Sequence, residues 1–335
     1  MVHISVTKPP RLLKVLAVIS AVGMALINLV GFLDTQTNSA LGCGPDWPLC
    51  NGQVVPNLNN EHVLIEFGHR MIVGGFAVIA TIFMIWAWRR YRDWVEARIF
   101  AIIGIGFIIV QSILGALAVL FVNPPAILAL HLGFGFLAMV GVALLTAFLW
   151  QMDCLAGGRP AGLQYRSLVL PKGLVWRIWI VWVYTYLALY LGSYVAFRSA
   201  GEACTGWPLC NGQIIPPLYG NIGLDFAHRV AAVILAILVL ELLWQLRKQK
   251  SARPDLYRGA GWLVVVVFLQ IITGANLALS HLGTGPYMLH VGNLMLLFTL
   301  VSYLAVQSLQ PVPKAQRWMA EPQPSIAPTR EPRHP

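Results

Sequence analysis

Eight long apolar runs restrict the fold of this chain more than any other feature of its sequence. An α-helix that crosses the hydrocarbon layer of a bilayer, about 30 Å thick, needs roughly 20 apolar residues. The runs lie near residues 12–32, 63–88, 98–121, 126–150, 174–197, 222–246, 259–280 and 287–308. Since 58% of the residues are hydrophobic and only 11% are charged, a soluble globular domain is excluded. We therefore predict an all-α membrane protein with eight transmembrane helices.

The second half of the sequence repeats features of the first half. The pentapeptide 66–70 (Glu-Phe-Gly-His-Arg) returns 159 positions later as 225–229 (Asp-Phe-Ala-His-Arg). The same offset relates four further pairs: His131 and His290, Gly133 and Gly292, Gln111 and Gln270, and Gly115 and Gly274. Each half thus carries one matched pair of histidines, as a duplicated ligand-binding unit would.

The repeat divides the chain into parts. We expect an N-terminal four-helix half over residues 1–150, a cytoplasmic linker over 151–173 and a C-terminal four-helix half over 174–310. Residues 311–335 are rich in proline and charge, and we expect a disordered cytoplasmic tail there. Because each half has an even number of spans, we predict two tandem bundles related by a pseudo-two-fold axis along the membrane normal.

The net charge of +10 would suit a nucleic-acid partner, but the distribution of charge indicates a membrane instead. Basic residues gather in every second loop, and Arg198 is the only basic residue in the intervening loops. By the positive-inside rule, both termini are then cytoplasmic and the matched histidines lie toward the outer face. We expect a multi-pass protein of a bacterial inner membrane, since no transit peptide precedes the first run.

Two predicted outer loops each contain a pair of cysteines. Cys43 and Cys50 enclose six residues, and Cys204 and Cys210 enclose five. Each pair can close on itself as a disulfide, because the outer side permits disulfides and proline and glycine turn the chain. Cys154 falls in the linker and should stay a free thiol. A structural disulfide is favoured over a thiol relay, and a zinc site is disfavoured because each loop offers only two sulfurs.

The four matched histidines are candidate ligands of a planar cofactor. His69 and His131 are predicted at similar depth, roughly 8–9 Å below the outer surface at about 1.5 Å per residue, and His228 and His290 repeat this arrangement. Two imidazoles at equal depth can face each other across a flat macrocycle. Neutral imidazole suits heme iron, whereas no thiolate or dense carboxylate cluster indicates zinc or di-iron. Interhelical hydrogen bonds explain one such histidine better than four in matched pairs.

Charged residues flank two of these histidines. Glu66 precedes His69 by three residues and projects from the same helix face, so it is a candidate base or stabiliser of positive charge. For Asp225, the favourable field of a helix N-terminus is an equally good explanation. Arg70 and Arg229 are candidates either for pairing with heme propionates or for anchoring in lipid headgroups.

Glycines accompany the histidines in both halves. Gly133 and Gly292 each follow their histidine by two residues, and Gly115 and Gly274 lie on the neighbouring predicted helix. They would leave room for the ring of a ligand, although small residues also let membrane helices pack closely.

Taken together, these elements resemble the heme A synthase family over about residues 12–308. The resemblance rests on the duplicated acid-x-x-His-Arg element, its partner histidines and the paired cysteines around Trp-Pro-Leu-Cys. It implies an enzyme that oxidises the methyl group at ring position 8 of heme O to a formyl group, giving heme A for terminal oxidases. The oxygen would come from water, through an alcohol and a hydrated aldehyde.

The resemblance also implies roles for individual residues. The C-terminal half would hold a permanent heme b between His228 and His290. The N-terminal half would take the heme O substrate between His69 and His131, with Glu66 as the catalytic carboxylate. The loop cysteines would form the family's outer disulfides, of which the pair in the C-terminal half is present only in some members.

Partners and alternatives follow from the same comparison. The resemblance implies heme O synthase and an oxidase assembly factor as partners, with quinone or another group as electron acceptor, and homo-oligomerisation stays open. One alternative function is a b-type membrane cytochrome that transfers electrons to or from quinone without modifying heme. Another is a transporter whose histidines line a proton path.

Overall fold

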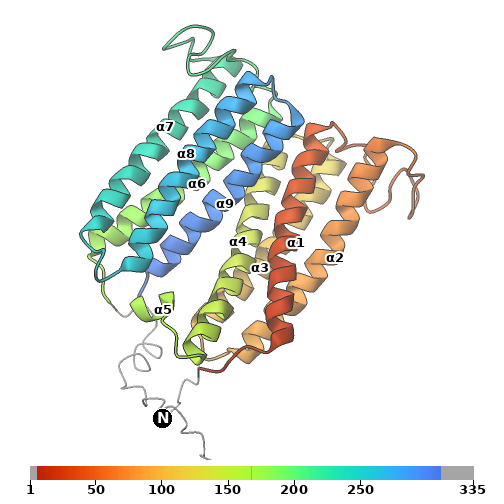
Figure 1. Ribbon diagram of the computed structural model, residues 1–335. Helices are drawn as coiled ribbons and strands as arrows, with labels where there is room; N and C mark the ends of the chain where they lie inside the picture. Colours follow the sequence, from red (N-terminus) through yellow and green to blue (C-terminus); the bar gives the residue numbers. More distant parts are fainter. Residues whose placement is uncertain (1–5, 167, 311–335) are drawn as a thin grey trace, which may run out of the picture.

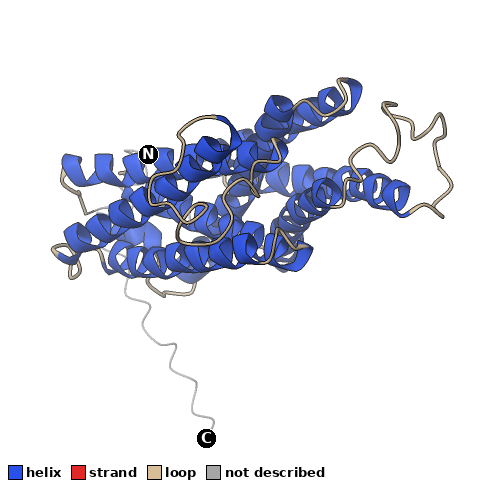
Figure 2. Ribbon diagram, turned by 90° about the horizontal axis from the view of Figure 1, so that it is seen from above, coloured by secondary structure: helices blue, strands red, loops and turns tan. Residues whose placement is uncertain are grey.

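The computed structural model describes residues 6–166 and 168–310, and these residues form nine helices and no strand (Figures 1 and 2). The helices are α1 (Arg11–Gln36), α2 (Glu61–Arg90), α3 (Val95–Leu120), α4 (Pro125–Ala156), α5 (Gly162–Tyr165), α6 (Lys172–Phe197), α7 (Gly220–Arg247), α8 (Pro254–Leu279) and α9 (Thr284–Ser308). All except the four-residue α5 are long and apolar enough to cross a membrane. The predicted eight-helix, all-α architecture is therefore confirmed.

The helix ends differ from the apolar runs because caps, rather than hydropathy, determine where a helix begins and ends. The side chain of Asn60 accepts a hydrogen bond of 2.9 Å from the amide of His62, so α2 begins two residues before the predicted run. Helix α4 continues six residues into the predicted linker and ends before Gly157. The linker itself contains α5, and the predicted tail at 311–335 lies outside the described residues.

The long helices form two groups that lie side by side (Figure 1). In one group α1 packs against α2 and α4, and α3 packs against α4. In the other α6 packs against α7 and α9, and α8 packs against α7 and α9. Glycines permit the closest contact: a methyl group added at Gly141 on α4 would lie 2.7 Å from Cα of Gly104 on α3. The two-fold relation between the groups stays a prediction.

Aromatic side chains fill the seam where α1 and α4 meet α6 and α9. The ring centroids of Phe136 and Phe298 are 6.0 Å apart, and those of Tyr186 and Phe298 are 5.6 Å apart. Trp182 stacks on Tyr186 and donates a hydrogen bond of 2.8 Å to Ser302. Because such ring pairs are attractive beyond the area they bury, this aromatic seam, residues Phe136, Trp182, Tyr186 and Phe298, holds the two groups together.

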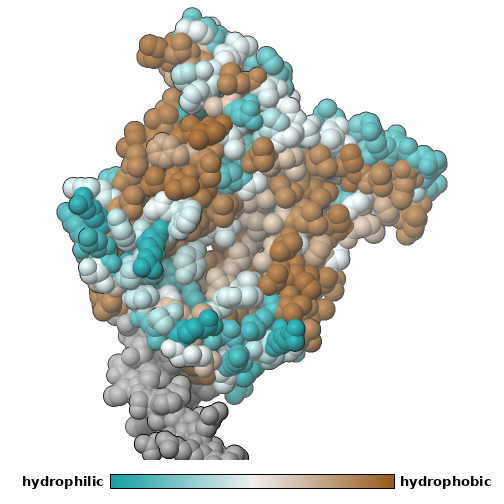
Figure 3. All heavy atoms as spheres, viewed as in Figure 1, coloured by the Kyte–Doolittle hydropathy of each residue, from teal (hydrophilic) through white to brown (hydrophobic). Residues whose placement is uncertain are grey.

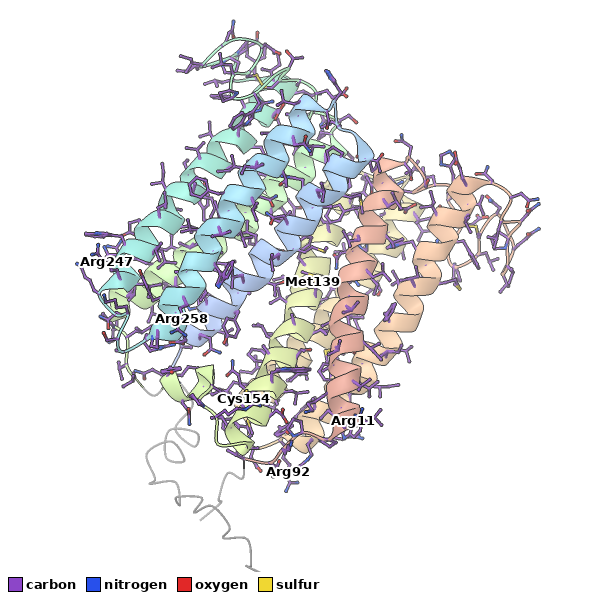
Figure 4. The ribbon with its side chains drawn as sticks, in the orientation of Figure 1. Arg11, Arg92, Met139, Cys154, Arg247 and Arg258 are labelled. Carbon is purple, nitrogen blue, oxygen red and sulfur yellow. A yellow bond between two sulfur atoms is a disulfide. The ribbon has the colours of Figure 1, made fainter. Side chains whose placement is uncertain are left out.

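The surface has an apolar middle and two polar ends (Figure 3). Large apolar side chains such as Val22, Trp176 and Ile237 are exposed along the helices, which is expected where lipid replaces water. The loops with the paired cysteines lie at one end, here called the disulfide end. Basic residues such as Arg11, Arg92 and Arg258 lie at the opposite, basic end (Figures 1 and 4).

A buried ion pair ties the linker to the basic end. Arg166 lies 2.9 Å from the carboxylate of Glu96 on α3 and donates a second hydrogen bond of 3.0 Å to the carbonyl of Leu309. Burial lowers the pKa of Arg166, and the charge of Glu96 opposes that effect. The pair thus joins both helix groups to the segment between them.

Candidate functional site

Each matched histidine of the first group lies against a glycine of the neighbouring helix. A methyl group added at Gly31 on α1 would lie 3.1 Å from Cε1 of His69, and one added at Gly115 on α3 would lie 3.0 Å from Cε1 of His131. Both distances are shorter than ordinary van der Waals contact. The glycines therefore give the imidazoles, rather than a separate ligand ring, their space.

The second group repeats these contacts. A methyl group at Gly192 on α6 would lie 2.7 Å from Cε1 of His228, and one at Gly274 on α8 would lie 3.1 Å from Cε1 of His290. The signal for Gly115 and Gly274 was visible in the sequence. Gly31 and Gly192 complete the same pattern, so each histidine has its own glycine.

The other pair of matched glycines lies away from the histidines. A methyl group at Gly133 would lie 3.1 Å from the hydroxyl of Tyr186 on α6, and one at Gly292 would lie 4.0 Å from Leu29 on α1. These glycines face the other helix group. Close helix packing, rather than room for a ligand, explains their position.

A cavity of about 300 Å³ lies within the first group and opens between side chains of all four of its helices. His69 and His131 both line it, and their role as ligands stays a prediction. Its polar lining also includes Glu66, Asp34 and Gln111, and apolar residues such as Ile27, Val73 and Leu132 complete the wall. Two imidazoles and two carboxyl groups thus share one largely apolar space.

The imidazole of His131 is oriented by a backbone carbonyl. Its Nδ1 lies 2.7 Å from the carbonyl oxygen of Gln111. Because a carbonyl can only accept, Nδ1 carries the proton of the neutral ring and Nε2 keeps its lone pair. In contrast, Nδ1 of His69 is buried with no hydrogen-bond partner among the described residues.

In the second group a side-chain network surrounds His290. The amide nitrogen of Gln270 lies 3.3 Å from Nδ1 and 3.2 Å from Nε2, and the hydroxyl of Thr273 lies 3.2 Å from Nδ1. Asn293 fixes Gln270 through a hydrogen bond of 2.6 Å to its Oε1. For Nε2 of His290 to bind a metal, the side-chain amide of Gln270 must move away from Nε2. Its contact with Nδ1, on the side of Thr273, can remain. Sequence reasoning found Gln270 but missed Thr273 and Asn293.

Glu66 is held at the disulfide end by two donors. Its Oε2 accepts a hydrogen bond of 2.7 Å from the amide of Cys43, and its Oε1 lies 2.5 Å from Nη2 of Arg70. Arg70 also donates to the carbonyls of Asp46 and Leu49, at 3.1 and 2.9 Å. The carboxylate is therefore tied to the loop between α1 and α2, which the predicted disulfide Cys43–Cys50 closes.

Asp225 repeats this arrangement with longer bonds. Its oxygens lie 3.1 Å from the amide of Cys204 and 3.5 Å from Nε of Arg229. Arg229 donates to carbonyls of its own loop, including that of Cys204 at 2.7 Å. The disulfide Cys204–Cys210 is present as predicted, and Cys154 is free. Since both arginines bind loop carbonyls, their pairing with heme propionates stays a prediction.

Asp34 is a candidate site residue that sequence reasoning missed. It lines the cavity from α1, and only 7% of its surface is exposed. The first apolar run ends at residue 32, so Asp34 fell in the predicted loop, whereas α1 continues to Gln36. An acidic residue so near the end of an apolar run was the available signal.

Comparison with known proteins places these features in a family. Residues 14–302 match the COX15-CtaA family, described as cytochrome oxidase assembly protein. The chain belongs to this family. It is 36% identical over 299 residues to a heme A synthase of Symbiobacterium thermophilum, covering 89% of this chain and 96% of that protein.

Two further relatives show a similar degree of identity. A heme A synthase of Halalkalibacterium halodurans is 37% identical over 301 residues, covering 88% of this chain and 97% of that protein. One of Bacillus cereus is 30% identical over 298 residues, covering 88% and 93%. Family membership and the eight apolar helices together make the chain a multi-pass membrane protein.

The donor set of this family member fits heme better than a bare metal ion. Among residues 6–166 and 168–310, no three side chains of His, Cys, Asp or Glu come together as a metal site. A heme needs only axial protein ligands, because the porphyrin supplies the rest. The oriented lone pair of His131 and the unpartnered imidazole of His69, both on one cavity, meet that requirement.

Proposed function

We propose that the protein is a heme A synthase, which oxidises the methyl group at ring position 8 of heme O to the formyl group of heme A for cytochrome oxidase biogenesis. The observation that carries this proposal is the cavity among α1–α4, where two imidazoles and the tethered carboxylate of Glu66 line the same space. Membership of the cytochrome oxidase assembly family and the named relatives support it.

His69 and His131 would hold the iron of the heme O substrate. The hydrogen bond from Nδ1 of His131 to the carbonyl of Gln111 keeps its Nε2 free to bind. Gly31 and Gly115 let both rings lie close against the neighbouring helices. These residues position the macrocycle and take no part in breaking bonds.

Glu66 is the residue proposed to handle protons. Oxidation of a methyl group with oxygen from water releases protons and electrons, so the site needs a base close to the reacting carbon. The Arg70 guanidinium and the Cys43 amide both hold the carboxylate of Glu66, so its position at the cavity is fixed. Glu66 stands one helical turn from His69 and lines the cavity, which suits this role.

His228 and His290 would bind a permanent heme b in the second group. That heme would supply one-electron transfer between the substrate site and an acceptor such as quinone. The unpartnered Nδ1 of His228 and the polar network around His290 support this assignment. The two groups would thus form the substrate half, 1–150, and the heme b half, 174–310.

The proposed orientation places the disulfide end outside and the basic end, with both termini, in the cytoplasm of a bacterium. Clusters of arginine at one end and disulfides at the other support it. We further propose heme O synthase and an oxidase assembly factor as partners, because substrate and product are both apolar and need delivery.

The test is to extract pigments from cells that co-express a heme O synthase with this chain. Heme A should appear only when the chain is present. Glu66→Gln should lower heme A formation by roughly a hundredfold or more while heme b stays bound. Asp225→Asn serves as the matched control and should keep most activity. A purified protein that holds two permanent hemes and never alters heme type would instead be a b-type cytochrome.

A further inference from the structure

Asp34 and Glu66 lie at the same edge of the cavity. Asp34 follows Gly31 by three residues on α1, so it lies about 4.5 Å nearer the disulfide end than the glycine that touches His69. Glu66 precedes His69 by three residues on α2, which runs in the opposite direction, so it is displaced by a similar amount toward the same end. Both side chains line the cavity.

The side chain of Asp34 has no local reason to be there. It is 93% buried, and no described residue donates a hydrogen bond to its Oδ1. It also stands in the last turn of α1, where the negative end of the helix dipole disfavours an acid. Burying a polar oxygen without a donor is costly unless a ligand supplies one.

Arg70, the cation whose charge acts on Asp34, makes its hydrogen bonds elsewhere. Arg70 pairs with Glu66 and donates to the carbonyls of Asp46 and Leu49, so its hydrogen bonds go to the loop. The chain after α1 contacts only the backbone of Asp34: the amide of Ser39 donates a hydrogen bond of 2.8 Å to the carbonyl oxygen of Asp34. The carboxyl group therefore remains available to the cavity.

The equivalent position in the other group carries no acid. The offset of 161 that aligns Gly31 with Gly192 and Cys43 with Cys204 aligns Asp34 with Val195. Both glycines contact the histidine of the next helix, which supports this alignment. The acid thus occurs only in the group proposed to take the substrate, and a role shared by both hemes is excluded.

We infer that Asp34 binds a hydroxyl group of the substrate. This inference rests on the proposed function. Heme O carries a hydroxyl group on the carbon that joins its isoprenoid chain to the macrocycle, on the pyrrole ring next to the one with the reacting methyl group. That hydroxyl donates to Oδ1 of Asp34 while Glu66 faces the methyl group. Protoheme lacks this hydroxyl, so Asp34 makes the site selective for heme O.

The test measures binding rather than turnover. Purified full-length protein that retains its heme b is titrated with heme O and with protoheme, and the change in absorbance is followed. The wild type should bind heme O more tightly than protoheme. Asp34→Val, which introduces the residue of the second group, should weaken heme O binding by about ten- to a hundredfold and leave protoheme binding unchanged. Asp34→Asn keeps an acceptor oxygen and should lose less.

The outcomes separate this inference from the proposed function. If the wild type makes heme A and prefers heme O, but Asp34→Val keeps that preference, the role of Asp34 is wrong and the function stands. The role of Asp34 is also wrong if Asp34→Val weakens the binding of heme O and of protoheme equally. The same holds if Asp34→Val binds heme O as the wild type does but accumulates a partly oxidised alcohol. If the wild type neither binds heme O nor makes heme A, both proposals fall. An unchanged heme b spectrum shows that each variant is folded.

Discussion

The two helix groups place a histidine pair, two glycines and an acid-arginine-loop unit in the same way, yet they treat their histidines differently. His131 is oriented by a backbone carbonyl beside an open cavity, whereas His290 is surrounded by the side chains of Gln270, Thr273 and Asn293. Because a backbone carbonyl orients His131, no side chain is needed there and the cavity beside the ring stays open for a ligand. The difference fits the proposed roles, in which the first group exchanges its heme and the second group retains one.

The acidic residues of the two groups, Glu66 and Asp225, also differ in how closely they contact their donors. Glu66 reaches its two donors at 2.7 and 2.5 Å, whereas the shorter Asp225 reaches the equivalent donors at 3.1 and 3.5 Å. The additional methylene group brings the carboxylate of Glu66 closer to the donors of its loop and arginine. A duplicated unit therefore becomes asymmetric through the length of one side chain.

The largest effect is expected from removing a histidine in each group. His228→Ala should strongly weaken heme b binding and with it activity, because it removes one of the two proposed axial ligands of that iron. His69→Ala should abolish heme A formation but leave the heme b spectrum intact. Absorbance spectra and pigment extraction distinguish the two variants. Equal loss of heme b in both would show that the groups do not have separate roles.

The next effect concerns acid length. Glu66→Asp should lower heme A formation by about ten- to a hundredfold, since the shorter carboxylate retreats from its donors and from the substrate. The reciprocal change Asp225→Glu should leave activity near that of the wild type. Activity is measured as the ratio of heme A to heme O in extracted pigments. If Glu66→Asp were as active as the wild type, the length of this acidic side chain would not matter for the reaction.

A smaller effect is expected from the glycines. Gly192→Ala should destabilise heme b binding by about 1–3 kcal/mol, because its methyl group would lie 2.7 Å from Cε1 of His228 and push the ring aside. At Gly31 the corresponding distance is 3.1 Å, so Gly31→Ala should be milder and should affect heme O alone. Titration of each heme provides the measurement. Gly261→Ala, a position with open space, is the control.

The smallest effect is expected from opening a loop. Replacing Cys43 and Cys50 by serine removes one closure, but Arg70 still holds the loop through the carbonyls of Asp46 and Leu49. Heme A formation should fall only a few-fold, and adding Arg70→Gln should lower it much further. A loss as large as that of Glu66→Gln in the double serine variant would mean that the disulfide itself takes part in the reaction.

Sequence alone was sufficient for features that depend on local chemistry. Apolar length predicted the eight helices, and the short spacing of the cysteines predicted both disulfides. The matched histidines His69 and His131 line one cavity, and their role as heme ligands stays a prediction. These features depend on residue type and repeat offset, which a single sequence records directly.

Features that depend on where helices end or meet could not be predicted in the same way. Asp34 was missed because hydropathy ends before the helix does, and Asn293 was missed because its partner Gln270 lies on another helix. The sequence left open whether Gly133 makes room for a ligand or for helix packing, and the fold places it against Tyr186. Such contacts arise from packing between segments that are distant in the sequence, and the periodicity of one segment carries no information about them.

The aromatic seam has a consequence for how far apart the two proposed heme positions can be. Phe136 and Phe298 are fully buried and meet midway between the groups, so neither group can shift along the other without breaking ring contacts. The separation between the two proposed hemes is therefore set by side chains at the seam between the groups. Trimming Phe298 would change that separation, and with it the speed of electron exchange, while all four matched histidines were kept.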